Sequence, residues 1–378
     1  MNLHLIDDKK FIKGAVDLFE EYYPESNHFF IQISRSEKFV EYKKLNYTNV
    51  TYSAFTRRKD INSILKFAKE KQVKNIFVHN LTPLKAAITS RIKKNTFAKT
   101  YWIFYGADLY GQLNALGKYD LLDSEEKPSK NQNDSFRSKL LFKYLFNSAP
   151  MKSYLYFIKQ LDFFCFWNEY DYFLLKKHFK TSAIYKPFLY YGLIDRSHSI
   201  FDFNNCVDKV LINNSASANG NHATVLKKIS ELDGSDVLSE IITPLSYGNQ
   251  EIKNSTLKYG YELFGVKFKP IKEYLPIDEY YALISNVPVA IFGHRRQEAA
   301  GNIFYLIGKG VKIFLRNDNN MISWFRDRGF IVYSFEDNLS SINDLRPLTY
   351  DERKINIDTY KNIFSKEAEF RNMNLLCD

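Results

Sequence analysis

The stretch 289–317, which reads VAIFGHRRQEAAGNIFYLIGKGVKIFLRN, constrains the fold more than any other part of the chain. An apolar run at Val289–Phe292 is followed by a polar loop, a short apolar helix from about Asn302 and a second apolar run at Lys312–Leu315. Short, continuously apolar strands joined through a helix are typical of parallel neighbours in a sheet covered on both faces. The stretch therefore predicts a β-α-β unit.

The loop inside this unit carries groups that suit a diphosphate. Gly293 to Glu298 places two guanidiniums, an amide and a carboxylate at the carboxyl end of a strand. Gly301-Asn302 then begins a helix whose first N–H groups have no intrahelical partner, and arginine can clamp two oxygens at once. A solvated loop without a ligand is equally compatible with this spacing.

The same alternation of strand and helix runs through both halves of the chain, which at 378 residues is too long for one compact core. The remaining predicted strands are Asn2–Ile6, Phe29–Ile33, Val50–Phe55, Asn75–His79, Tyr101–Tyr105, Phe163–Trp167, Lys209–Asn213, Glu240–Thr243, Val266–Pro270 and Phe330–Tyr333. Each half has the length and order of a doubly wound domain. We predict an α/β protein with domains at 1–198 and 207–352, a cleft between them, and a closing helix at 353–378.

The charge balance points to anionic partners, because the formal net charge is +10 and the pI is near 9.1. Cys165, Cys206 and Cys377 are too scattered for a disulfide framework or a metal site, which fits a reducing cytoplasm. We expect no metal and no cofactor. The first ten residues lack an apolar signal core, and no apolar run approaches the ~20 residues of a spanning helix. These features predict a soluble or peripheral protein.

Two segments of the first half break the regular pattern. Asp123–Ser135 is polar and reads as a surface loop or, alternatively, a lid. Ser135–Leu161 combines aromatic residues with lysines, which suits a helix at an anionic bilayer surface. A core helix pair with solvated lysines, broken at Pro150, is the alternative.

Further polar loops follow predicted strands. In the second half, 214–222 (NSASANGNH) leads into a helix, and Tyr247 lies in the turn after Glu240–Thr243. No dinucleotide or P-loop motif is present. In the first half, strand ends carry Asp8, His79 and Asp108, any of which could act as a general base. Asp108 could instead be a helix cap, His79 a satisfied strand-end histidine and Tyr247 a packing residue.

Taken together, these loops resemble a bacterial family of glycosyltransferases. Its members add 4-acetamido-4,6-dideoxygalactose (4-acetamidofucose) from a TDP-sugar to the lipid-linked intermediate of enterobacterial common antigen. The resemblance runs from about Leu3 to Trp324. It is carried in order by Tyr105-Gly106-Ala107-Asp108-Leu109-Tyr110, Asn214-Ser215, Asn219, His222, Pro244, Tyr247, a predicted helix capped by Asp278 with Tyr280, Ala282 and Leu283, then Arg296, Gln297, Gly301, Leu315 and Asn317.

The resemblance implies a GT-B fold with an acceptor-binding first domain and a nucleotide-sugar-binding second domain. It also implies metal-independent transfer, with inversion at the anomeric carbon. The expected partners are a TDP-activated sugar donor, a polyprenyl-diphosphate-linked saccharide acceptor and an anionic membrane surface. The loops and the resemblance together predict donor-binding residues at Asn214, Ser215, Asn219, His222, Tyr247, Arg296, Gln297, Glu298, Gly301, Asn302 and Asn317. Asp108, followed by Asp8 and His79, is the predicted catalytic base. The resemblance also implies that the protein is located at the cytoplasmic face of the bacterial inner membrane, as a peripheral protein.

The sequence departs from the family pattern in places. The aromatic stretch before Gly106 lacks an expected histidine, Asp123–Ser135 looks like an insertion, and Glu298 and Asn302 replace other residues of the donor loop. The pathway could therefore be that of an O-antigen or a capsule. Two other functions stay open: a nucleotide-sugar epimerase or hydrolase of the same fold, and a basic protein that binds nucleic acid. No nucleic-acid recognition element supports the last.

Overall fold

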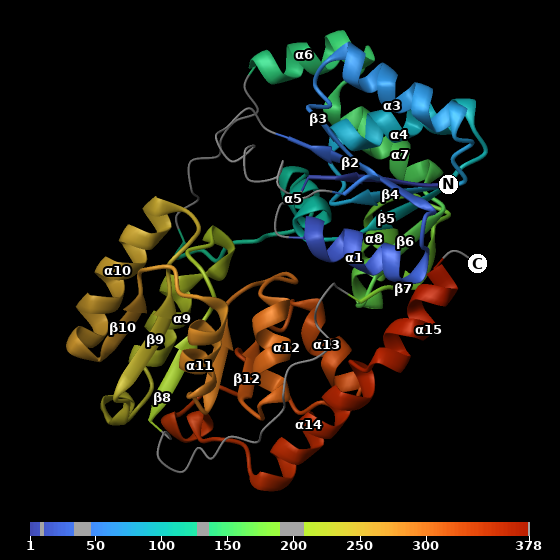
Figure 1. Ribbon diagram of the computed structural model, residues 1–378. Helices are drawn as coiled ribbons and strands as arrows, with labels where there is room; N and C mark the ends of the chain where they lie inside the picture. Colours follow the sequence, from blue (N-terminus) through green and yellow to red (C-terminus); the bar gives the residue numbers. More distant parts are fainter. Residues whose placement is uncertain (8–10, 34–46, 127–135, 190–207, 377–378) are drawn as a thin grey trace. The chain divides into compact units, whose positions relative to one another are not determined.

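The computed structural model describes residues 1–7, 11–33, 47–126, 136–189 and 208–376 (Figure 1). These residues form two compact units. The first contains residues 1–116, 136–189 and 366–376, and the second contains 117–126 and 208–365. The chain thus leaves the first unit and returns to it twice.

The first unit is built on a seven-stranded parallel sheet in the order β3-β2-β1-β4-β5-β6-β7. Its strands are β1 (Asn2–Ile6), β2 (Asn27–Gln32), β3 (Val50–Ser53), β4 (Asn75–His79), β5 (Lys99–Ile103), β6 (Phe163–Phe166) and β7 (Ile184–Pro187). The apolar runs predicted the first six, whereas β7 was not predicted. It lies at the sheet edge, and its half-exposed sequence IYKP lacks the apolar signal of a buried strand.

Helices cover both faces of this sheet. They are α1 (Ile12–Tyr22), α3 (Arg58–Glu70), α4 (Pro83–Asn95), α5 (Ala107–Ala115), α6 (Phe136–Phe146), α7 (Pro150–Gln160), α8 (Glu169–His178) and α15 (Lys366–Leu376). Figure 1 shows α3, α4 and α7 side by side on one face, with α1 and α15 on the other. The core beneath α1 contains Phe19, Phe29, Phe77 and Tyr101, and Met373 of α15 joins it. The rings of Phe77 and Tyr101 are stacked.

The second unit holds a six-stranded parallel sheet in the order β10-β9-β8-β11-β12-β13. Its strands are β8 (Lys209–Ile212), β9 (Glu240–Pro244), β10 (Phe268–Ile271), β11 (Val289–Phe292), β12 (Lys312–Leu315) and β13 (Tyr333–Ser334). Its helices are α9 (His222–Ser230), α10 (Gln250–Phe264), α11 (Ile277–Ser285), α12 (Ala300–Gly308), α13 (Asn320–Asp327) and α14 (Tyr350–Ile363). Counted from β8, this is the strand order of a Rossmann-type sheet, with the order reversing between β8 and β11.

Three local predictions need correction. Asp278 does not cap α11, because Pro276 holds the cap position and Asp278 lies in the first turn. The closing helix is two helices, α14 in the second unit and α15 in the first. Residues 117–126, which fall in the predicted first domain, belong to the second unit. Contacts that are distant in sequence decide this last assignment, as shown below.

Candidate functional site

One asparagine ties together the loops that follow β8 and β11. The Asn213 side-chain oxygen accepts a hydrogen bond from the Gly293 N–H at 2.9 Å, and its amide donates to the Gly220 carbonyl at 2.8 Å. Its backbone is left-handed, with φ of 57°, a conformation that asparagine adopts more readily than most residues. Because Asn213 bonds to both loops, it holds the loop after β8 against the loop after β11 at the carboxyl edge of the sheet.

A polar cluster lies in these loops around Glu298. Its carboxylate is 2.6 Å from Arg296 Nη2 and 3.5 Å from Asn219 Nδ2, while His294 Nε2 is 3.7 Å away. Burial alone would raise the pKa of Glu298, but the Arg296 guanidinium and, to a smaller extent, the neighbouring His294 hold it at about 2. Glu298 is therefore ionised at neutral pH and orients Arg296. Three predicted donor residues, Asn219, Arg296 and Glu298, meet here.

His222 lies at the start of α9 and is almost completely buried. Burial, together with a smaller effect of the neighbouring His294, lowers its pKa to about 3. The imidazole is thus neutral near pH 7 and can contribute hydrogen bonds but no charge.

Two tyrosines form a second polar group with predicted donor residues. Asn214 donates to the Tyr247 hydroxyl at 3.0 Å, and the Ser215 side chain also bonds to that hydroxyl. Asn302 donates to the Tyr280 hydroxyl at 2.6 Å. Tyr247 is 52% exposed, so it is not a core packing residue. Its ring is available as a platform at the end of β9.

The remaining predicted donor residues lie in different surroundings. Gln297 is buried, and its side-chain oxygen has no hydrogen-bond partner among the described residues. Gly301 is in the first turn of α12, with open space where a side chain would be. Asn317 instead bonds to Glu336 and Asp337.

The N-termini of α9 and α12 differ in what occupies them. The Glu126 carboxylate accepts from the N–H groups of Ala223 and Thr224, at 2.7 and 3.2 Å, so the start of α9 already holds an anion. Helix α12 begins two residues before the predicted Asn302, and its cap residue Ala299 offers no side-chain acceptor. Within the part of the chain that the structure describes, no side chain caps α12, so its N-terminus is the end open to an anion.

The segment around Asp123 was not predicted to be part of this region. Asp123 accepts two hydrogen bonds from Arg316, at 2.6 and 3.0 Å, and Arg316 also pairs with Glu336. Burial opposes ionisation of Asp123, yet the Arg316 contacts bring its pKa below the usual range. Arg295 pairs with Asp318 at 2.5 Å. Asp123 and Glu126 thus bind the segment 117–126 to the loops of the second unit.

In the first unit, Asp108 is buried at 5% exposure, and both of its oxygens are occupied. One accepts from the N–H of Leu81 at 2.8 Å and from the Trp102 indole at 2.6 Å. The other accepts from the Tyr105 N–H at 3.2 Å, as a carboxylate in the first helical turn does. Burial raises the pKa of Asp108 to about 6. These contacts fit a residue that joins β4, β5 and α5.

The other predicted bases are placed differently. His79 is buried within the sheet, where its Nε2 is 3.0 Å from Nδ1 of His4, and burial takes its pKa well below the usual value. Asp8 lies outside the described residues.

Asp7 is a carboxylate at the end of β1 that the sequence analysis did not choose. It is 2.7 Å from the Nζ atom of Lys85, which is fully buried, and it accepts from Asn80 at 3.3 Å. Both bonds use Oδ1. Its side chain is 20% exposed and lines a hollow of about 230 Å³ together with Gln32 and Thr82. The sequence shows that the pair Asp7-Asp8 follows a predicted strand, but this position does not indicate which of the two carboxylates is the base.

The Glu298 cluster predicts a pH dependence of stability. The folded-state pKa of about 2 lies below the ordinary 4.5, so the ionised carboxylate stabilises the fold above pH 4.5. This contribution is lost as the pH falls from about 4.5 to about 2. We expect Glu298→Gln to lower the thermal unfolding midpoint at pH 7. Between pH 4.5 and about 2, the midpoint of this variant should fall less steeply than that of wild type. Glu262→Gln, on an exposed face of α10, should follow the wild-type curve.

Among the described residues, no group of three or more His, Cys, Asp or Glu side chains is placed to hold a metal ion. None of the helices in the described ranges has the length and hydropathy needed to span a bilayer.

Comparison with known proteins identifies a family and a fold. The model of the "4-alpha-L-fucosyltransferase glycosyl transferase group 56" family matches residues 171–360, which is half of the chain. A glycosyltransferase from Rickettsia africae superposes with a TM-score of 0.62 at 11% identity, covering 100% of this chain and 97% of that one. HepE from Anabaena, in complex with UDP, superposes with a TM-score of 0.62 at 7% identity, covering 99% of this chain and 98% of that one.

The sucrose-phosphate synthase of Thermosynechococcus elongatus superposes with a TM-score of 0.61 at 9% identity, covering 100% of this chain and 98% of that one. At identities this low, the structural similarity shows the fold alone. It confirms the predicted GT-B class, with its two Rossmann-like sheets.

Proposed function

The chain belongs to glycosyltransferase group 56, the 4-alpha-L-fucosyltransferase family, and we propose that it transfers a 4-amino or 4-acetamido deoxyhexose from a TDP-sugar to a lipid-linked saccharide. The product would be part of a bacterial surface polysaccharide, such as enterobacterial common antigen, an O-antigen or a capsule. The observation that carries the proposal is the polar edge at the ends of β8, β9 and β11. All of its residues lie inside the matched range.

We assign the donor diphosphate to Arg296 and the open end of α12. As the bond between the anomeric carbon and the diphosphate breaks, negative charge develops on the leaving oxygen. A guanidinium and free N–H groups would stabilise that charge without a metal ion. The Tyr247 ring, supported by Asn214 and Ser215, is the proposed platform for the nucleoside.

We assign the acceptor to the first unit and the base to Asp7. An acceptor hydroxyl that attacks the anomeric carbon from the opposite side must lose its proton. The Asp7 carboxylate lines a hollow at the sheet's carboxyl edge, whereas both Asp108 oxygens are occupied. Inverting, metal-independent transfer at the cytoplasmic face of the membrane is the corresponding proposal for mechanism and location.

Ligand-induced stabilisation tests the donor. Thermal unfolding would be followed with TDP-, UDP-, GDP- and CMP-linked sugars, since a ligand that binds only the folded state raises the midpoint. The largest rise is expected with TDP-sugars. Equal or absent shifts with all four would contradict the donor assignment, and release of free sugar without acceptor would identify a hydrolase instead.

Arg296→Ala is expected to weaken TDP binding by roughly 1.5–3 kcal/mol, because a charge-assisted contact is removed. Calorimetric titration of the folded variant measures the loss. Arg326→Ala, which removes an exposed guanidinium elsewhere in the same unit, is the control and should bind TDP normally. Unchanged affinity in Arg296→Ala would remove this residue from the donor site.

A further inference from the structure

Three adjacent hollows run along the first unit and share lining residues. The first, of about 230 Å³, contains Asp7 at the carboxyl edge of the sheet. Pro83, Lys139 and Pro150 line both this hollow and a second of about 870 Å³. Ser148 and Lys152 line both the second and a third of about 570 Å³, between α4 and α7. We call the second and third hollows the basic groove.

The basic groove is strongly cationic. Its basic lining residues are Arg91, Lys94, Lys139, Lys143, Lys152 and Lys159. Among the described residues, no carboxylate lines it, and none of the five lysines forms an ion pair. Unneutralised cations around a concave surface attract anions and raise their local concentration.

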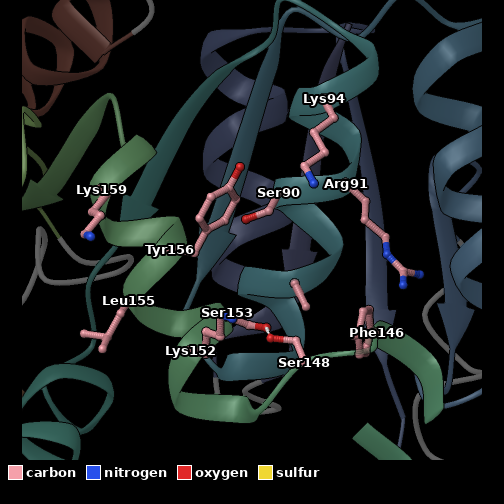
Figure 2. Close-up of a pocket in the computed structure, with 11 residues that line it drawn as sticks. Ser90, Arg91, Lys94, Phe146, Ser148, Lys152, Ser153, Leu155, Tyr156 and Lys159 are labelled. Atoms are coloured by element: carbon pink, nitrogen blue, oxygen red, sulfur yellow. Dashed lines mark hydrogen bonds between the residues drawn. The ribbon is translucent and has the colours of Figure 1, made fainter. Parts of the chain in front are cut away.

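The third hollow, between α4 and α7, also presents hydroxyl groups. Figure 2 shows Ser90 and Lys94 of α4 facing Tyr156 of α7 across it, with Ser153 bonded to Ser148 at 3.1 Å below. Ser90 is 7% exposed, and its buried hydroxyl has no hydrogen-bond partner among the described residues. A buried hydroxyl without a partner beside a lysine is suited to a phosphate oxygen.

Exposed apolar side chains lie on α6, the helix that supplies Lys139 and Lys143 to the groove. Leu140, Leu141 and Tyr144 of α6 are 51%, 43% and 63% exposed, and Tyr156 of α7 is 41% exposed. Phe142, Leu145 and Phe146 of the same helix α6 are buried, so the outward apolar residues are additional to its packing face. A small polar anion would leave these apolar side chains in water. An amphiphile would cover them.

We propose that the basic groove binds the diphosphate of the lipid-linked acceptor, with the lipid chain lying over Leu140, Leu141 and Tyr144. This inference rests on the proposed function. Asp7 lines the first hollow, and lysines line the two hollows that continue from it. A saccharide held near Asp7 would therefore place its diphosphate among the lysines. The inference thus places the diphosphate of that acceptor at a subsite in the first unit, distinct from the donor site in the second unit.

The test is calorimetric titration with farnesyl diphosphate. Each basic residue beside an anionic group contributes about five-fold in affinity, so Lys139→Glu/Lys143→Glu/Lys152→Glu should bind at least about 100-fold more weakly. An equal charge change on the second unit, Lys258→Glu/Lys354→Glu/Lys361→Glu, should leave binding unchanged. Leu140→Asn/Leu141→Asn should weaken farnesyl diphosphate about ten-fold and leave inorganic diphosphate unaffected.

Three results would overturn the proposal. Inorganic diphosphate could bind as tightly as farnesyl diphosphate, which would show a phosphate site without lipid recognition. Phosphatidylglycerol vesicles could bind through the same lysines without competition from farnesyl diphosphate, which would show a bilayer-docking face. The wild-type protein could bind TDP-sugar and transfer it, yet ignore farnesyl diphosphate. Loss of TDP-sugar binding with farnesyl diphosphate binding intact would instead contradict the proposed function alone.

Discussion

Replacing Asp7 with asparagine is expected to lower turnover by about 10²-fold or more, because the acceptor hydroxyl loses its proton acceptor. The nucleotide affinity should not change, since the donor residues lie in the second unit. The amide oxygen can keep the bonds from Lys85 and Asn80, so the side chain holds its position. Steady-state kinetics with saturating donor and acceptor measure the effect.

The buried lysine beside Asp7 complicates a single substitution. Lys85 is fully buried, and removing one member of a buried ion pair is strongly destabilising, whereas replacing both by neutral groups is often tolerated. The double variant Asp7→Asn/Lys85→Met should therefore fold as well as wild type and remain inactive. Lys85→Met alone keeps the carboxylate and should keep measurable turnover.

Asp108→Asn provides the contrast for this assignment. An asparagine at this position must turn an NH₂ group toward one of the three N–H donors that the carboxylate accepts. Asp108→Asn should therefore lower the unfolding midpoint, while the turnover of the protein that remains folded stays near that of wild type. Near-normal turnover in Asp7→Asn, together with a large loss in a well-folded Asp108→Asn, would return the base to Asp108.

The sequence predicted the sheets because their strands carry a local signal. Val289–Phe292 and Lys312–Leu315 are buried strands with the predicted limits, since continuous apolar runs between polar loops have few other folded solutions. The edge strand β7 was missed because a strand half exposed to solvent needs no such run. The cap predicted at Asp278 failed because the preceding Pro276 starts the helix two residues earlier.

The candidate site was predicted only in part, because its contacts join distant segments. Asn219, Arg296 and Glu298 were chosen from their loops, and the structure brings them together. Asp123 meets Arg316 across 193 positions of sequence, which no local pattern reveals. The burial of Asp108 could not be predicted from its own turn, because two of its three donors, Leu81 and Trp102, lie outside that turn.

Gly293→Ala is expected to destabilise the second unit by about 1–3 kcal/mol or more, the usual range for overpacking a close contact. An added Cβ would lie 2.3 Å from the Gly220 carbonyl oxygen and 2.7 Å from Val225 Cγ2. Neither neighbour can easily move: Asn213 holds the Gly220 carbonyl and the Gly293 N–H together, and Val225 is in the core. Thermal unfolding and TDP titration would both record the loss.

The matched control for Gly293→Ala is Gly301→Ala, eight positions further along the same β-α-β unit. An added Cβ at Gly301 meets nothing within 4 Å. Because Gly301 is helical, alanine should leave the unfolding midpoint unchanged or raise it, by up to about 1 kcal/mol in stability. The open space is where the proposed diphosphate would approach α12. A stable Gly301→Ala protein should therefore bind TDP more weakly, and unchanged TDP affinity would place the diphosphate away from this helix end.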